Sequence, residues 1–248
     1  MKNIATKLLI KFIFLIGLSN FSFADSIVDS NLCSSKIGRG GNLISEQNGF
    51  LYGKCQGKVS APSSSNKILT FQTAAQTKES VVSSKKSVDR SELAFVNKPI
   101  LVGQTYNINY DIKIDRSSDI TNTWFYVMQL WQNEKLPPVF SGRISRGTSK
   151  NLAFVVRNPD VHVTGAVIKR LDLPQDDWTN FSIKILIDSD YIGHINILKN
   201  GEQFVNWEGK LGYPSIQPSN QFRLKFGMYK EHEQNKDFKV YFRNIKLN

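Results

Sequence analysis

The chain has few of the residues on which many active sites depend, because its 248 residues include only three histidines and two cysteines. His162, His194 and His232 form no HxH or HExxH pair, so the usual zinc-enzyme motifs are missing. With so few histidines, no Ser/His/Asp set can be argued. Two thiols are also too few for a structural zinc site. No Asp-rich calcium loop of EF-hand type is present, so we expect no cofactor and no catalytic metal, although a structural calcium ion stays open.

Long apolar segments are also missing after the first residues. Residues 1–24 have a basic start, an apolar middle and a small-x-small ending at Ser22–Ala24, which is typical of a secretory signal peptide. The apolar part contains Lys11 and is short for a membrane span. We therefore expect an exported, soluble chain that is periplasmic or extracellular and leaves the membrane once the signal is removed.

The two cysteines, Cys33 and Cys55, match no metal-binding spacing. In an exported chain a single pair is expected to form a disulfide. Such a bond would stabilise the N-terminal segment by about 3 kcal/mol in the chain-entropy model. We predict a structural role for it and no chemistry.

The charge is strongly positive. Removing residues 1–24 takes away Lys2, Lys7 and Lys11 and no acidic residue, which lowers the formal net charge from +11 to +8. A basic surface favours nucleic acid, anionic lipid or a polyanionic glycan. Export and the lack of a nucleic-acid motif argue against nucleic acid. We expect a monomer that binds an acidic polysaccharide; a basic surface that only keeps the protein soluble is the alternative.

Patterns of period two dominate the chain, and no long stretch has helical periodicity. They predict a short strand with loops around it at Ile68–Phe71. Further strands are predicted at Thr105–Ile114, Thr123–Trp131, Asn151–Asn158, Asn180–Ile187, His194–Leu198, Gln221–Lys230 and Phe238–Leu247. Asn200–Glu202 predicts a hairpin turn that joins the strand at His194–Leu198 to a further strand at Glu202–Trp207. Many short strands favour an all-β sandwich of jelly-roll type, formed by residues 25–248 as one domain. If one sheet curves, its concave face would be a substrate groove.

The strand at Gln221–Lys230 carries the most suggestive polar face. Its apolar residues Phe222, Leu224, Phe226 and Met228 alternate with Arg223, Lys225, Gly227 and Tyr229. One face is therefore expected to be buried, while the other presents two cations and a tyrosine. A tyrosine beside fixed positive charge could move a proton on an acidic sugar. An edge strand with solvated cations is the alternative.

Two further strands offer partners for this face. In Asp89–Phe95, Arg90 and Glu92 share one side, which indicates either a solvated ion pair or an arginine held by a carboxylate and aimed at an anion. In the strand ending at Trp131, strict alternation places Gln129 and Trp131 on one side with Phe125 and Val127, and puts Trp124, Tyr126, Met128 and Leu130 on the other. A buried amide needs hydrogen-bond partners, so Gln129 either bonds internally or faces a groove.

Glycoside hydrolysis by two carboxylates is a rival chemistry. The available acids are Glu92, Glu208, Asp176, Asp177 and Asp188. All except Glu92 fall in expected turns or at strand ends, and no strand carries an E-x-D-x-E-like run. This pattern disfavours a hydrolase.

Four motifs together resemble a known family: Arg90–Leu93, Val127–Trp131, Gly193–Glu202 and Leu224–Lys230. In this order they are similar to the jelly-roll polysaccharide lyases of the heparin lyase I and glucuronan lyase type, with the related alginate lyases. The resemblance extends from about Asn66 to the C-terminus. It implies cleavage of uronate-containing chains by β-elimination. Many members read Q-x-H, with the histidine as base, whereas this chain has Trp131 at that place.

The resemblance implies catalytic roles for Tyr229, Lys225, Arg90 and Gln129. Tyr229 would protonate the leaving oxygen and also take the carbon-5 proton, because the usual histidine is missing; the other three would neutralise the substrate carboxylate. We assign Trp131, Arg223, Glu92, Arg157 and His194 to substrate binding. A non-catalytic protein of the same fold that binds acidic glycans is the alternative.

Overall fold

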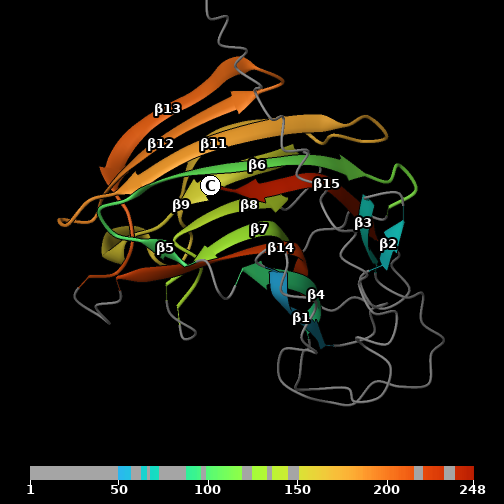
Figure 1. Ribbon diagram of the computed structural model, residues 1–248, viewed down its shortest axis with the longest axis horizontal. Helices are drawn as coiled ribbons and strands as arrows, with labels where there is room; N and C mark the ends of the chain where they lie inside the picture. The colour runs from blue at the N-terminus through green and yellow to red at the C-terminus, as the bar shows by residue number, and fades with distance from the viewer. Residues whose placement is uncertain are drawn as a thin grey trace, which may run out of the picture.

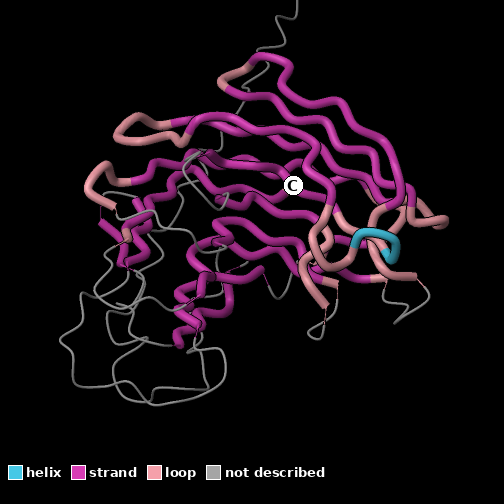
Figure 2. Tube along the Cα trace, turned by 180° about the vertical axis from the view of Figure 1, so that it is seen from behind, coloured by secondary structure: helices cyan, strands magenta, loops and turns pink. Residues whose placement is uncertain are grey.

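Two antiparallel β-sheets pack face to face and form almost all of the structure (Figure 1). The computed structural model describes residues 50–56, 63–65, 68–72, 88–95, 99–118, 125–132, 136–144, 151–214, 220–231 and 238–248. Within these ranges the only helix is the short 3-10 turn η2 (Pro159–Val161), drawn in cyan in Figure 2. No helix in the described part of the chain is long and apolar enough to cross a membrane.

In the described part of the chain the first sheet has eight strands, which include those that carry Arg90, Gln129 and Tyr229. Its order is β1 (Phe50–Gln56), β4 (Val88–Phe95), β14 (Gln221–Glu231), β7 (Phe125–Trp131), β8 (Phe140–Ile144), β9 (Asn151–Val156) and β10 (Ala166–Asp172), with β5 (Ile100–Leu101) pairing beside β14. The strands β4, β14 and β7 are therefore neighbours, although they are far apart in the sequence.

The second sheet has seven strands among the residues that the structure describes. Its order is β13 (Glu202–Lys210), β12 (Ile192–Lys199), β11 (Thr179–Ile187), β6 (Thr105–Ile114), β15 (Lys239–Leu247), β3 (Ile68–Gln72) and β2 (Ser63–Ser65). The turn between β12 and β13 has positive φ at both Asn200 (51°) and Gly201 (86°), as a two-residue hairpin of the primed type requires. The predicted hairpin at Asn200–Glu202 is confirmed.

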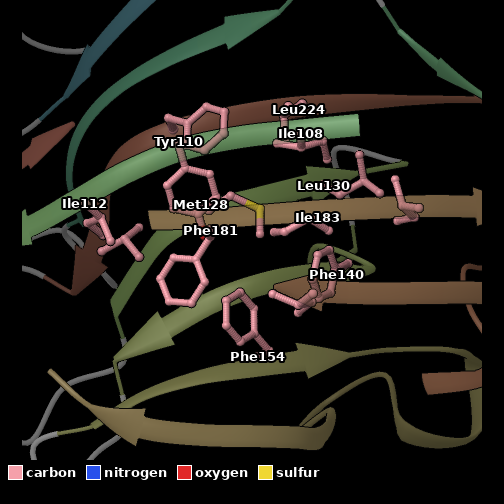
Figure 3. Packing of buried hydrophobic residues seen from close by; sticks show 14 of the residues in the cluster. Ile108, Tyr110, Ile112, Met128, Leu130, Phe140, Phe154, Phe181, Ile183 and Leu224 are labelled. Atoms are coloured by element: carbon pink, nitrogen blue, oxygen red, sulfur yellow. The ribbon is translucent and has the colours of Figure 1, made fainter. Parts of the chain in front are cut away.

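The core lies between the sheets, where apolar side chains from their inner faces interdigitate (Figure 3). The labelled core residues are fully buried and come from both sheets: Ile108, Tyr110, Ile112, Phe181 and Ile183 face Met128, Leu130, Phe140, Phe154 and Leu224. Burying a large apolar side chain stabilises the fold by about 1.5–3 kcal/mol. The alternation in each strand therefore fixes which face turns inward and which polar residues turn to the opposite, outer face.

The structure confirms the predicted all-β jelly-roll sandwich. The pattern at Thr105–Ile114 matches β6 at both ends, and the other predicted strands match to within three residues wherever they are described. Residues 1–24, with the predicted signal peptide, and Cys33 lie outside the described residues, so the disulfide with Cys55 stays a prediction.

Candidate active site

The outer face of the first sheet brings Arg90, Gln129, Lys225 and Tyr229 together. In β14, Tyr229 lies opposite Arg90 of β4 on one side, and Lys225 lies opposite Gln129 of β7 on the other. Residues that oppose each other directly in neighbouring strands share a face. The four residues that the resemblance singled out therefore form one cluster on three adjacent strands.

Glu92 is the acceptor shared by this cluster. Gln129 donates a hydrogen bond from Nε2 to Glu92 Oε1. Arg90 Nε lies 3.2 Å from Glu92 Oε2, as an ion pair without the alignment of a hydrogen bond, and Lys225 Nζ lies 4.0 Å from the same oxygen. The Glu92 side chain is only 3% exposed. This is a buried, charged cluster, and the alternative of a solvated ion pair is excluded.

Trp131 fixes the orientation of the Gln129 amide. Its indole Nε1 donates to Gln129 Oε1 at 2.8 Å, which leaves the amide nitrogen to face Glu92. The Lys225 ammonium lies 4.1 Å from the centre of a Trp131 ring, as a cation–π contact. Trp131 was assigned to substrate binding, but these contacts make it a residue that positions Gln129 and Lys225. Arg223 is exposed opposite Trp131, where a ligand could reach it.

Tyr229 is half-buried between a cation and a second aromatic ring. The Arg90 guanidinium lies 4.4 Å from the centre of its ring. On the other strand, the ring of Tyr126 stacks nearly parallel to it, with centroids 6.1 Å apart and 23° between the planes. The phenol ring is thus held between the Arg90 guanidinium on one side and the Tyr126 ring on the other.

Tyr126 is a residue of the site that the sequence prediction placed on the wrong face. Strict alternation put Phe125 and Val127 on the face of Gln129, but both belong to the core. A bulge in β7 at Val127 shifts the register with β8 between Tyr126 and Met128, so the faces exchange there. Tyr126 therefore joins Gln129 on the outer face.

Gly227 makes the matching irregularity in β14 possible. Its φ of +128° lies in a region that other residues rarely adopt, and the register with β7 shifts between Phe226 and Tyr229. A Cβ at this position would collide with the backbone oxygen of Ser91 in β4. A glycine in the middle of a strand pattern is the one sequence signal that could have revealed an irregularity here.

Arg157 lies beside the site and holds Tyr126. It is fully buried, donates from Nη2 to the Tyr126 hydroxyl at 3.0 Å and from Nη1 to the Pro138 carbonyl at 2.9 Å. Burial lowers the pKa of its guanidinium, while the neighbouring Tyr126 opposes this shift. The structure therefore places Arg157 as a support for Tyr126, where a bound sugar could not touch it.

His194, in contrast, lies far from this cluster. It projects from β12 of the second sheet, and its Nδ1 is 3.2 Å from Glu208 Oε2, with 44% of the histidine side chain exposed. Its strand neighbour Ile195 is in the core, so His194 points away from the first sheet. The structure does not bring His194 to the predicted site.

The carboxylates needed for a hydrolase are not assembled either. Among the five acids considered for hydrolysis, Glu92 is the one on the first sheet; Asp176, Asp177, Asp188 and Glu208 lie in or next to the strands of the second. Within the described ranges, no three His, Cys, Asp or Glu side chains come close enough to hold a metal ion. The cluster instead combines two cations, an amide and a phenol, a set suited to stabilising an anionic intermediate and moving a proton.

A model of a known protein family matches most of the chain. Residues 52–246 match the family model described as polysaccharide lyase. A comparison with curated protein sequences gave no match.

Several solved structures have a similar fold at low identity. An endo-β-1,4-glucuronan lyase from the fungus Trichoderma reesei is 11% identical, with a TM-score of 0.62 over 82% of this chain and 92% of that one. Alginate lyase A1-II′ is 14% identical, with a TM-score of 0.51 over 79% and 84%. The catalytic domain of a family 131 glycoside hydrolase from Coprinopsis cinerea reaches 0.50 at 16% identity, over 73% and 69%.

The fold is thus shared by lyases and by a hydrolase, and at these identities it does not separate the two. The family match does, because it spans most of the chain, including every strand of the cluster. It also favours an enzyme over a protein that only binds glycans. The chain belongs to the polysaccharide lyase family.

Proposed function

We propose that this lyase is exported and cleaves an acidic, uronate-containing polysaccharide by β-elimination, with Tyr229 acting as both base and acid. The observation that supports this most directly is the contact of the Arg90 guanidinium with the Tyr229 ring, 4.4 Å from its centre, next to Lys225 and Gln129. Two similar structures are named as lyases of glucuronan and of alginate, which are both polyuronates.

The substrate carboxylate must be neutralised before the carbon-5 proton can be removed, because the intermediate carries extra negative charge on that group. Arg90 and Lys225 supply two positive charges, and Glu92 cancels one of them while holding both in place. Gln129 has a second amide N–H besides the one directed at Glu92. These donors would bind the carboxylate more strongly as its charge grows.

Elimination then proceeds with Tyr229 as the proton carrier. The C5–H bond breaks and its proton moves to the Tyr229 oxygen, which starts the step as the deprotonated phenolate; the electron pair forms the C4–C5 double bond, and the C4–O bond breaks. Tyr229 passes the proton to the leaving oxygen. The products are a chain with an unsaturated uronate end and a chain with a new hydroxyl group.

One residue can serve both steps only when the proton and the leaving oxygen lie on the same face of the sugar ring. β-Linked mannuronate and 4-linked glucuronate meet this condition, whereas guluronate and iduronate do not. We therefore propose a polymer of mannuronate or glucuronate as substrate. A panel of these polymers, followed by the ultraviolet absorbance of the unsaturated product, tests the choice.

Replacing Tyr229 with phenylalanine tests the mechanism. Loss of the proton carrier should lower kcat by about 10²–10⁴-fold. Tyr241→Phe is the matched control, since Tyr241 lies in β15 of the second sheet and hydrogen-bonds Asp115 there. Wild-type rates of product formation by Tyr229→Phe would refute the role of Tyr229. New reducing ends without unsaturation would instead indicate hydrolysis.

We also propose that residues 1–24 direct export and are removed, which makes the enzyme periplasmic or extracellular. The arrangement of charge and apolar residues in this segment supports the proposal. Intact-mass measurement of the protein recovered from its producing cell tests it. A mature chain that begins near Asp25 is expected, and a cytoplasmic chain that retains Met1 would contradict it.

A further inference from the structure

A row of directly opposed residues crosses the outer face of the first sheet and continues well beyond the cluster. Each member pairs with the next across neighbouring antiparallel strands from β4 to β10, and the row reads Arg90, Tyr229, Tyr126, Arg143, Ala153 and Arg170. Paired residues share a face, so all six lie on the face of the cluster. We call the part of this row beyond Tyr126, formed by Arg143, Ala153 and Arg170, the arginine row.

In the described part of the chain, the two arginines of this row lack a carboxylate partner. Arg143 is half-buried and donates from Nη1 to the Thr164 carbonyl at 3.2 Å, while Arg170 is exposed. Neither forms an ion pair with a carboxylate in the described part of the chain. Arg90, in contrast, is held by Glu92. Arg143 and Arg170 can therefore accept a carboxylate of a ligand without giving up an internal one.

The spacing of the row suits an extended acidic chain. Neighbouring strands lie about 4.8 Å apart, so Arg143 is about 10 Å and Arg170 about 19 Å from the strand of Tyr229. One 1,4-linked hexuronate residue advances a chain by close to one strand spacing. In an extended chain with a two-fold repeat, alternate carboxylates lie on the same side. Every second carboxylate of the bound chain would then lie beside an arginine of the row.

Ala153 lies between the two arginines of the row. It is paired with Arg143 on one side and with Arg170 on the other, and its methyl group is fully buried. A large side chain here would rise between the two guanidinium groups. The alanine therefore places no large side chain between the two arginines.

We propose that Arg143 and Arg170 form distal subsites that bind the carboxylates of uronate residues about two and four positions from the cleaved bond. This inference rests on the proposed function, because it takes the bond to be cleaved at Tyr229. It deepens that function: the enzyme discriminates by chain length, prefers long polyuronates and cleaves within them.

Oligouronates of defined length test the proposal. For the wild type, kcat/KM should rise with length until the chain covers the arginine row. In Arg170→Ala, kcat/KM should stop rising only for the longest oligouronates. In Arg143→Ala, it should stop rising at a shorter chain length. On the polymer each change should raise KM about two- to fivefold at unchanged kcat, as for an exposed ion pair.

Lys184→Ala is the matched control, because Lys184 is an exposed cation on β11 of the second sheet and its loss changes the net charge equally. This variant should keep the wild-type length profile. Wild-type profiles for both arginine variants would overturn the inference and leave the lyase chemistry intact. If Lys184→Ala lost the same part of the dependence of kcat/KM on chain length, the inference would be overturned too, since overall charge would then explain the effect.

Binding separates this inference from the proposed function. Retardation of the Tyr229→Phe protein in gels that contain a polyuronate is measured with and without Arg143→Ala and Arg170→Ala. If the wild type forms no unsaturated product, the proposed function fails, yet weaker retardation of the arginine variants would still support the subsites. Equal retardation of all variants, or none for any of them, would overturn the subsites.

Discussion

Replacing Glu92 with glutamine tests whether this carboxylate organises the site. The Glu92 side chain is 3% exposed, and its Oε2 lies 3.2 Å from Arg90 Nε and 4.0 Å from Lys225 Nζ. Glutamine keeps the shape and one acceptor oxygen, so the hydrogen bond from Gln129 can remain. The change removes the negative charge between two cations whose side chains are themselves only 11% and 8% exposed.

The expected cost follows from this burial. Removing one partner of a buried ion pair costs about 3–5 kcal/mol, because the other charge stays buried and uncompensated. We expect about 3 kcal/mol, since glutamine fills the same space and Lys225 is at the limit of ion-pair distance. In a domain of roughly 200 residues, each kcal/mol lowers Tm by about 2–4 °C, so the variant should melt about 6–12 °C below the wild type.

Thermal unfolding followed by circular dichroism gives this shift, and Glu208→Gln supplies the control. Glu208 pairs with His194 at 3.2 Å, but its side chain is 70% exposed. An exposed pair contributes less than about 1 kcal/mol, so the control should melt within about 4 °C of the wild type. Equal shifts for the two variants would refute the view that Glu92 is a buried shared acceptor. Adding Lys225→Met to Glu92→Gln should recover part of the loss, because it removes one uncompensated cation.

Three further changes test the fold that supports the site. Gly227→Ala should lower the unfolding free energy by about 2–6 kcal/mol in urea titrations, through the strained backbone and the collision with Ser91; a wild-type midpoint would contradict this. Tyr110→Phe should raise the unfolding free energy by about 1 kcal/mol, since its buried hydroxyl has no partner among the described residues, and a decrease would contradict that. For Asp111, burial would raise the pKa, but three side-chain hydrogen bonds outweigh it and lower the pKa. The stabilisation from the Asp111 carboxylate is then complete above the unfolded pKa of about 3.9 and is lost as the pH falls below it. The difference in unfolding free energy between the wild type and Asp111→Asn should therefore narrow on acidification. A difference that does not change with pH would refute the lowered pKa.

For most strands, the sequence predicts which side chains turn toward the core, because this depends on the alternation within that one strand. In β14 the alternation correctly separated the buried Phe222, Leu224, Phe226 and Met228 from Lys225 and Tyr229. The same reasoning was wrong in β7, where the bulge at Val127 depends on the registers with β8 and β14. An apolar strand shows no polar residue out of phase, so its sequence does not reveal such a shift.

The order of strands within each sheet is a non-local property, and this limited the prediction of the site. His194 alternates with core residues as predicted, but nothing near it in the sequence indicates that β12 belongs to the second sheet. Arg157 is buried because the loop at Gly165 lies over it: a Cβ on that glycine would lie 3.1 Å from Arg157 Cγ. Which arginine is covered by a loop is decided by contacts between segments and not by local periodicity.

The tryptophan at position 131 explains how the cluster can work without the histidine of the Q-x-H pattern. Its indole N–H is a donor only, so it cannot carry a proton between substrate atoms. It holds the Gln129 carbonyl instead, and its ring faces the Lys225 ammonium. Where the Q-x-H pattern has a histidine, this chain therefore has a residue that positions Gln129 and Lys225, two of the groups proposed to neutralise a carboxylate. In the proposed mechanism, proton transfer then falls to the phenol of Tyr229, which lies next to Arg90 in the same cluster. A single carrier acts from one side of the sugar ring, and for this reason the residue at position 131 bears on which uronate the enzyme can cleave.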